Sequence, residues 1–285
     1  MRCSAWRMMA AMEKGHTAHL EDLAAKVWPR LISEIDELAV RAQAGAWSVP
    51  LKTSLAADDQ RTKPFHTSHA VHQCLVAGID NLSGLRHMIF GAPGAHGEEA
   101  TLHHAAHYLL ARGAIENFAT ALWILDPSSR SERVTRTLRW HAQNIKDMHS
   151  ALAPLPVEFS TTTREEKFER LEQILRDSVG GVPARFRSGY TTTEVVEYVD
   201  DAFSATDSFF STVFIWRLCS GFAHGRPWAS IGFLEQEELV SDDPEVVHTR
   251  MQSDLPRALM APQHALELCG RLLATYRSRS TPIEG

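Results

Sequence analysis

The chain has 285 residues, of which 44% are hydrophobic and 22% charged, a composition typical of globular proteins with one large domain or two small ones. Its formal net charge of −6 excludes a polycation that binds nucleic acid over its whole surface, so a nucleic-acid site would have to be a local basic patch. The four cysteines form no CxxC pair, which favours a reduced, cytoplasmic protein over a disulfide scaffold.

The N-terminus lacks the sustained apolar run of a signal peptide, and no later segment is apolar over the length of a membrane span, so we expect no membrane partner. Helical periodicity predicts a first helix at residues 17–45. Pro29 should kink or split it, because proline removes a hydrogen bond from a helix interior. Residues 46–65 have the composition of a polar connection. We therefore expect residues 1–60 to form an N-terminal helical extension.

Residues 61–285 are also mostly helical in pattern, whereas alternating strand patterns are scarce. Residues 180–190 are expected to form a loop and residues 227–240 an irregular segment, and the last helix should break near Pro262. The predicted fold class is therefore all-α, a helical bundle domain at residues 61–285 preceded by the N-terminal helical extension. Its helices are predicted at residues 67–90, 98–125, 128–152, 162–179, 191–203, 206–223 and 243–278.

The stretch WRLCSGFAHGRPW, residues 216–228, ends an apolar helix that we expect to be buried around most of its circumference. Arg217 and His224 are seven positions apart, a rotation of about −20° and an advance of roughly 10 Å, so they share one stripe of that helix. Ser220 and Gly221 fall between them on the same side. Gly221 should leave room for a ligand or a second backbone to approach closely.

A guanidinium and an imidazole on one stripe suit metal-independent cleavage of a phosphodiester. Histidine can accept or donate a proton near neutral pH, and an arginine fork can hold a phosphate and stabilise its developing charge. The structural interpretation is that Arg217 pairs with a carboxylate and His224 caps the helix. Spacing alone leaves both interpretations open.

The segment RLCSGFAH resembles the R-x(4–6)-H signature of HEPN domains, which are all-α bundles found in toxin–antitoxin, abortive-infection and CRISPR-associated ribonucleases. The resemblance covers one helix of about 20 residues. It implies a metal-independent RNA endonuclease in which Arg217 binds the phosphate and His224 is the acid or base, often at a cleft shared by a homodimer. It also implies a role in phage defence and an antitoxin partner. Leu218 departs from the polar residue that often follows the arginine in the family.

Arg112 and Glu116 interrupt another apolar helix, four positions apart and therefore on one face. A charge buried there must be paired. In the functional interpretation they support the cleft of Arg217 and His224, with Glu116 orienting one of these side chains. In the structural interpretation they form an ion pair that fixes the register of the bundle.

Three further arginines are candidates for RNA binding. Arg226 directly follows the proposed site and could hold a flanking phosphate. Arg185 and Arg187 flank Phe186 in a glycine-containing loop, a pattern that suits contact with a single strand.

The fifteen histidines raise the possibility of a metal site, because His103 and His107 have the spacing at which two imidazoles on one helix share a metal, with His87 as a third ligand. No HExxH motif or ExxH repeat accompanies them, so we expect no metal and no cofactor. Two alternatives to the ribonuclease therefore stay open: a metal-dependent helical enzyme, and a non-catalytic binding or scaffold protein in which Arg217, Glu116 and His224 form a buried polar network.

Overall fold

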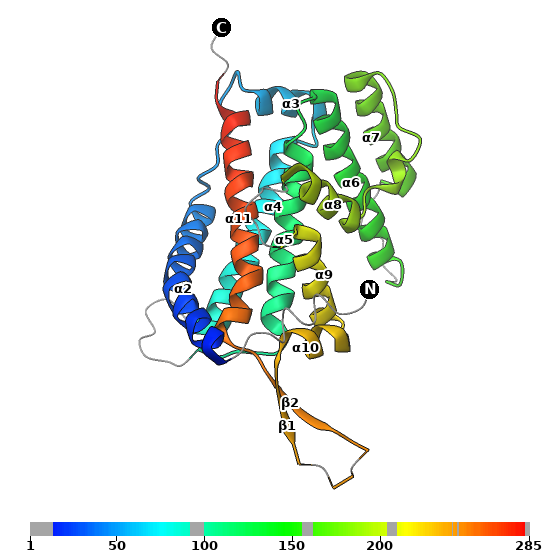
Figure 1. The fold of residues 1–285 in the computed structure, drawn as a ribbon. Coiled ribbons are helices and arrows are strands. Elements are labelled where there is room, and N and C mark those ends of the chain that lie inside the picture. The colour runs from blue at the N-terminus through cyan, green and yellow to red at the C-terminus, as the bar shows by residue number, and fades with distance from the viewer. Residues whose placement is uncertain are drawn as a thin grey trace. The chain divides into compact units, whose positions relative to one another are not determined.

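The computed structural model describes residues 14–91, 100–155, 162–203, 210–240, 242–243 and 245–282 (Figure 1). As predicted, the fold is an all-α helical bundle. None of the helices in these ranges is long and apolar enough to cross a membrane. The elements are α2 (Lys14–Gln43), α3 (Ser54–Thr62), α4 (Thr67–Phe90), α5 (Ala106–Leu125), α6 (Arg130–Leu152), α7 (Arg164–Val179), the 3-10 helix η1 (Phe186–Ser188), α8 (Thr192–Phe203), α9 (Thr212–Ala223), α10 (Pro227–Phe233), β1 (Glu235–Leu239), β2 (His248–Gln252) and α11 (Leu255–Ser280).

The chain divides into two compact units, and each is built from three separate segments. Unit 1 comprises Met1–Ala44, Ala77–Glu116 and Ala205–Leu268, and unit 2 comprises Gly45–Val76, Asn117–Ser204 and Cys269–Gly285. This division differs from the expected boundary between residues 60 and 61, which falls inside α3.

In unit 1, α2 is an integral helix of the bundle. Its apolar residues Trp28, Leu31 and Ile35 are buried, as the spacing of three and four positions requires for one helix face. The indole Nε1 of Trp28 donates a 3.0 Å hydrogen bond to the carbonyl oxygen of Leu255, at the start of α11. The helix continues without interruption through Pro29, contrary to the predicted split.

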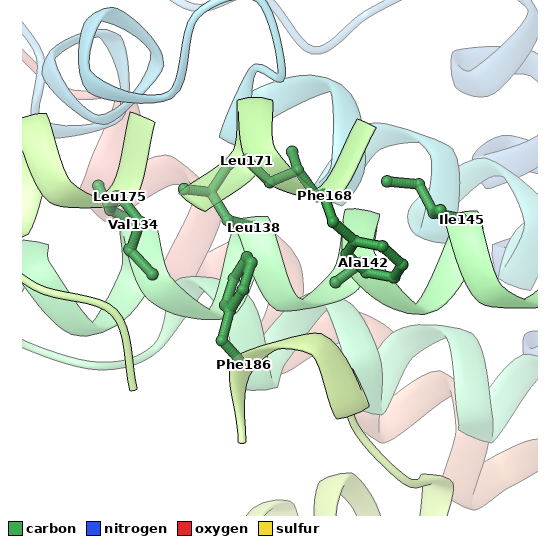
Figure 2. Packing of buried hydrophobic residues seen from close by; sticks show 8 residues of the cluster. All are labelled: Val134, Leu138, Ala142, Ile145, Phe168, Leu171, Leu175 and Phe186. Atoms are coloured by element: carbon green, nitrogen blue, oxygen red, sulfur yellow. The ribbon is translucent and has the colours of Figure 1, made fainter. Parts of the chain in front are cut away.

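In unit 2, the helices α6 and α7 pack around an apolar cluster, with η1 closing one side (Figure 2). The side chains that point toward one another there are Val134, Leu138, Ala142, Ile145, Phe168, Leu171, Leu175 and Phe186. Helix α7 begins with a capping box, in which Thr163 and Glu166 each accept a hydrogen bond from the backbone N–H of the other. The segment 180–190 was predicted as a loop, and it contains η1, which buries Phe186.

Helix α3 lies in the segment 46–65 that was predicted as a connection. Its buried face is partly acidic, so hydrophobic periodicity does not reveal it. Asp58 is fully buried and accepts hydrogen bonds from Nε and Nη2 of Arg133, at 2.6 and 2.9 Å. Asp59 accepts from the backbone N–H and the hydroxyl of Ser68 at 2.8 and 2.7 Å.

Three predicted segments differ from the observed secondary structure. Residues 100–105 of the third predicted helix are not helical, because α5 begins only at Ala106; residues 98–99 lie outside the described ranges. The segment 227–240 contains α10 and strand β1, and the predicted helix at 243–278 contains strand β2 before α11. The two strands form an antiparallel hairpin in which Glu237 is paired with Arg250. Pro262 lies inside α11 without breaking it.

Candidate functional site on helix α9

Helix α9 is delimited by its own sequence. The hydroxyl oxygen of Ser211 accepts a 3.1 Å hydrogen bond from the backbone N–H of Phe214, which caps the N-terminus. At the other end, the N–H of Gly225 donates to the carbonyl of Phe222 at 3.1 Å and that of Arg226 to Gly221 at 2.8 Å, the two bonds of a Schellman motif. Gly225 takes the left-handed conformation that this turn needs, with φ of +58°. The segment 204–209, where the helix was predicted to begin, lies outside the described residues.

One side of α9 is buried, and on the opposite, half-buried side Arg217 is exposed; we call the side that carries Arg217 the open side. Ile215, Leu218 and Phe222 are buried within unit 1, whereas Arg217 and His224 are exposed. Among residues Thr212–Ala223 only Arg217 is exposed, so α9 is buried or half-buried around most of its circumference, as its apolar composition indicated.

Arg217 and His224 are both unengaged on this open side. Neither side chain has a hydrogen-bond or ion-pair partner among the residues that the structure describes. His224 caps the helix with its backbone, whose N–H donates to Ser220 at 3.0 Å, and this leaves its imidazole in solvent. Ser220 is half-buried between them. Arg217 and His224 thus project from one stripe with their polar groups free for a ligand.

Of the two expectations for Gly221, the structure leaves no space for a ligand, whereas a second segment of the chain does approach it closely. A Cβ atom at this position would lie 2.7 Å from Cζ2 of Trp228 and 2.8 Å from Cβ of Ala229. The room beside Gly221 is therefore filled by α10, which packs directly against the end of α9.

Glu116 belongs to a polar contact between α5 and α9. Its Oε1 accepts hydrogen bonds of 2.8 Å from Nε of Arg112 and of 2.8 Å from Nε1 of Trp216. Arg112 and Glu116 are both partly exposed, at 27% and 28%. These bonds agree with the structural interpretation of the Arg112–Glu116 pair, since they link α5 to α9 and hold the two helices in register. The buried network expected for Arg217, Glu116 and His224 is absent from the described residues, because Arg217 and His224 are exposed.

Cys219 lies within the motif but faces the core. It is buried, and this burial raises the pKa of its thiol well above the ordinary range. A thiol in this state does not supply a nucleophilic thiolate. The ionisable chemistry on α9 therefore rests on Arg217 and His224.

The predicted RNA-binding arginines differ in availability. Arg226 is exposed at the N-cap of α10, next to the site. Arg187, in unit 2, donates to the carboxylates of Glu172 and Glu165 and is already neutralised by them. Arg185, also in unit 2, is exposed.

The histidines considered for metal binding are not arranged as predicted. His103 precedes the first residue of α5, so it does not share a helix face with His107. His107 is fully buried, whereas His103 and His87 are exposed. Within the described ranges, no group of three or more His, Cys, Asp or Glu side chains is placed to hold a metal ion.

Sequence reasoning overlooked one residue of this surface, Trp228. Its indole packs on Gly221 and yet its side chain stays 44% exposed. The signal was the Arg-Pro-Trp sequence that follows His224 and Gly225. Proline favours the first position of a helix, so Pro227 marks the start of a new helix directly after the turn at Gly225. No model of a known protein family, no curated protein and no solved structure matches this chain.

Proposed function

We propose that this protein is a metal-independent RNA endonuclease of the HEPN type, with its site on the open side of α9. The observation that carries the proposal is that Arg217 and His224 share one exposed stripe and have no protein partner among the described residues. Arg187, by contrast, is exposed but is held by the carboxylates of Glu172 and Glu165. A guanidinium left without a counter-ion is available to an anionic ligand.

The chemistry follows from the two side chains. Arg217 binds the scissile phosphate and stabilises the negative charge that develops on its oxygens. The 2′-hydroxyl of the RNA attacks phosphorus, the bond from the 2′-oxygen to phosphorus forms, and the bond from phosphorus to the 5′-oxygen breaks. A base removes the proton of the 2′-hydroxyl and an acid protonates the leaving 5′-oxygen, which leaves a 2′,3′-cyclic phosphate and a free 5′-hydroxyl. His224 performs one of these two proton transfers.

In an in-line attack the 2′-oxygen and the leaving 5′-oxygen lie on opposite sides of phosphorus, so one imidazole cannot reach both and the second transfer needs another group. A homodimer would supply the His224 of a second copy, and the resemblance to HEPN domains favours this arrangement. On the same resemblance we place the protein in the cytoplasm, in phage defence or a toxin–antitoxin system. There an antitoxin would restrain it.

The test is cleavage of a fluorescent single-stranded RNA in EDTA. The wild-type protein should cut RNA but not DNA of the same sequence, because DNA lacks the 2′-hydroxyl. The products should end in a 2′,3′-cyclic phosphate. His224→Ala and Arg217→Ala should abolish cleavage, while His104→Ala, an exposed histidine outside the site, should leave it unchanged.

Both site variants should melt at the wild-type temperature, because exposed side chains without partners contribute little to stability. Intact RNA in every buffer, or cleavage that persists in His224→Ala, contradicts the proposal. A lower melting temperature for Arg217→Ala together with no cleavage supports the non-catalytic scaffold instead.

A further inference from the structure

The surface beside Arg217 and His224 carries an exposed aromatic ring in a fixed position. Trp228 is the one exposed tryptophan among the residues that the structure describes. Its Cζ2 and Cε2 atoms lie against Gly221, at 2.7 and 3.1 Å from where a Cβ would be. Gly221 is four residues after Arg217 and three before His224, so it lies about 40° and 60° around the helix from them. The indole therefore flanks the stripe between the two proposed catalytic side chains.

The ring is held on a second side by Phe233. The two ring centroids are 6.5 Å apart, with an interplanar angle of 82° that is typical of an edge-to-face pair. Pro227 fixes the backbone immediately before it, at the first position of α10. An indole that is 44% exposed and yet held by Gly221 and Phe233 loses little conformational freedom when a ligand covers it.

We propose that Trp228 is a stacking platform for an unpaired base next to the scissile phosphate, so that the ligand of this surface is single-stranded RNA. This inference rests on the proposed function and adds to it the class of substrate and a residue that binds it. Arg217 and Arg226, which both precede Trp228 in the sequence, are exposed cations on the same two helices as the ring and its Gly221 contact. Exposed cations near an exposed aromatic ring provide contacts for the phosphates and for an unpaired base of a single strand.

A duplex would not use this surface in the same way, because its bases are stacked on one another and their faces are covered. A protein partner would use the exposed apolar area of α10 as a whole. That area includes Ile231, which is 43% exposed and lies one turn after Trp228. Ile231 therefore provides a matched control on the same helix.

The experiment measures the affinity for a fluorescent single-stranded RNA in the His224→Ala background, in which no turnover occurs. Adding Trp228→Ala should weaken binding about 10-fold, the loss expected for one stacked base. Trp228→Phe should restore most of the affinity, and Ile231→Ala should leave it unchanged. The slope of affinity against salt should be unchanged in Trp228→Ala and reduced in Arg217→Ala, because only the arginine neutralises a phosphate.

An abasic nucleotide tests the stacking directly. When the strand carries an abasic site next to the scissile position, Trp228→Ala should cause no further loss of affinity, since the base that it contacts is absent. Circular dichroism identifies a variant that fails to fold, in which case Trp228→Phe and the abasic strand on the unaltered ring still decide the question.

The outcomes separate this inference from the proposed function. Equal losses in Trp228→Ala and Ile231→Ala, or equal losses on intact and abasic strands, overturn stacking. If cleavage depends on His224 but Trp228→Ala does not change the affinity for RNA, the stacking proposal is contradicted while the proposed nuclease function is supported. If the protein neither binds nor cleaves RNA, both fail together.

Discussion

Nε1 of Trp216 donates a 2.8 Å hydrogen bond to Oε1 of Glu116, and this bond fixes the rotation of α9 against α5. Trp216 directly precedes Arg217, so a bond that fixes the rotation of α9 also fixes the position from which Arg217 extends. The same carboxylate oxygen accepts a hydrogen bond from Nε of Arg112. The three side chains hold the helix from which the proposed site projects.

Trp216→Phe should destabilise unit 1, because it removes the hydrogen-bond donor to a charged acceptor while it keeps an aromatic ring at this position. We expect a loss of about 1 kcal/mol in the free energy of unfolding, at the low end for such bonds since Glu116 is partly exposed. Urea denaturation measures this. Trp228→Phe, at an exposed tryptophan, should change the midpoint less, and equal effects would contradict the role given to Glu116.

Replacing either glycine at the end of α9 by alanine should destabilise the protein, for a different physical reason at each position. Gly225→Ala meets no neighbour within 4 Å but must adopt a positive φ, which costs about 1–2 kcal/mol. Gly225→Asn should recover part of the loss, because asparagine tolerates this conformation. Thermal melts of both variants check the expectation.

Gly221→Ala should displace α10, because the new methyl group would overlap Trp228 and Ala229. Overpacking of this kind costs about 1–3 kcal/mol, and Gly221→Asn should do no better than Gly221→Ala. The change in indole fluorescence at Trp228, read against a Trp228→Phe background, reports the displacement. An unaltered spectrum with full stability would show that α10 does not pack as described.

In unit 2, Asp58→Ala should be strongly destabilising. Asp58 is fully buried and Arg133 is 2% exposed, so the substitution leaves a buried guanidinium without its counter-ion, at a cost of about 3–5 kcal/mol. Glu132→Ala removes the exposed i,i+4 partner of Arg136 and should cost less than about 0.5 kcal/mol. Parallel urea titrations compare them, and similar losses would refute the structural role of Asp58.

The protein should lose stability at acidic pH because His107 is buried in its neutral form. Burial lowers the pKa of this imidazole from 6.5 to about 4. Between these two values the unfolded chain binds a proton that the folded chain does not, so the free energy of unfolding decreases as the pH falls from 6.5 toward 4, by about 3 kcal/mol in all. His107→Leu should reduce this dependence but leave the part that comes from His141, whose pKa burial also lowers to about 4, whereas His104→Leu, at an exposed position, should not change it. Denaturation across this pH range provides the measurement.

Local sequence was sufficient wherever an element carries its own apolar periodicity and its own caps. Helix α4 was predicted with its observed bounds, and α7 begins at its capping box. Local sequence did not reveal α3, because its buried face contains Asp58 and Asp59. The burial of these carboxylates depends on hydrogen bonds from Arg133 and Ser68, which are distant in sequence. Local sequence also missed the hairpin: β1 is exposed at every residue, so no buried face imposes an alternating pattern.

For the site, the sequence by itself determined that Arg217 and His224 share a stripe, because helix geometry fixes the angle between residues seven positions apart. It also determined where α9 ends, since Gly225 alone supplies the left-handed turn. Only the tertiary structure decided that the stripe faces solvent, that Glu116 binds Trp216, and that Trp228 fills the space at Gly221. These depend on which helices pack together, and contacts between residues distant in sequence leave no periodic signal in either partner.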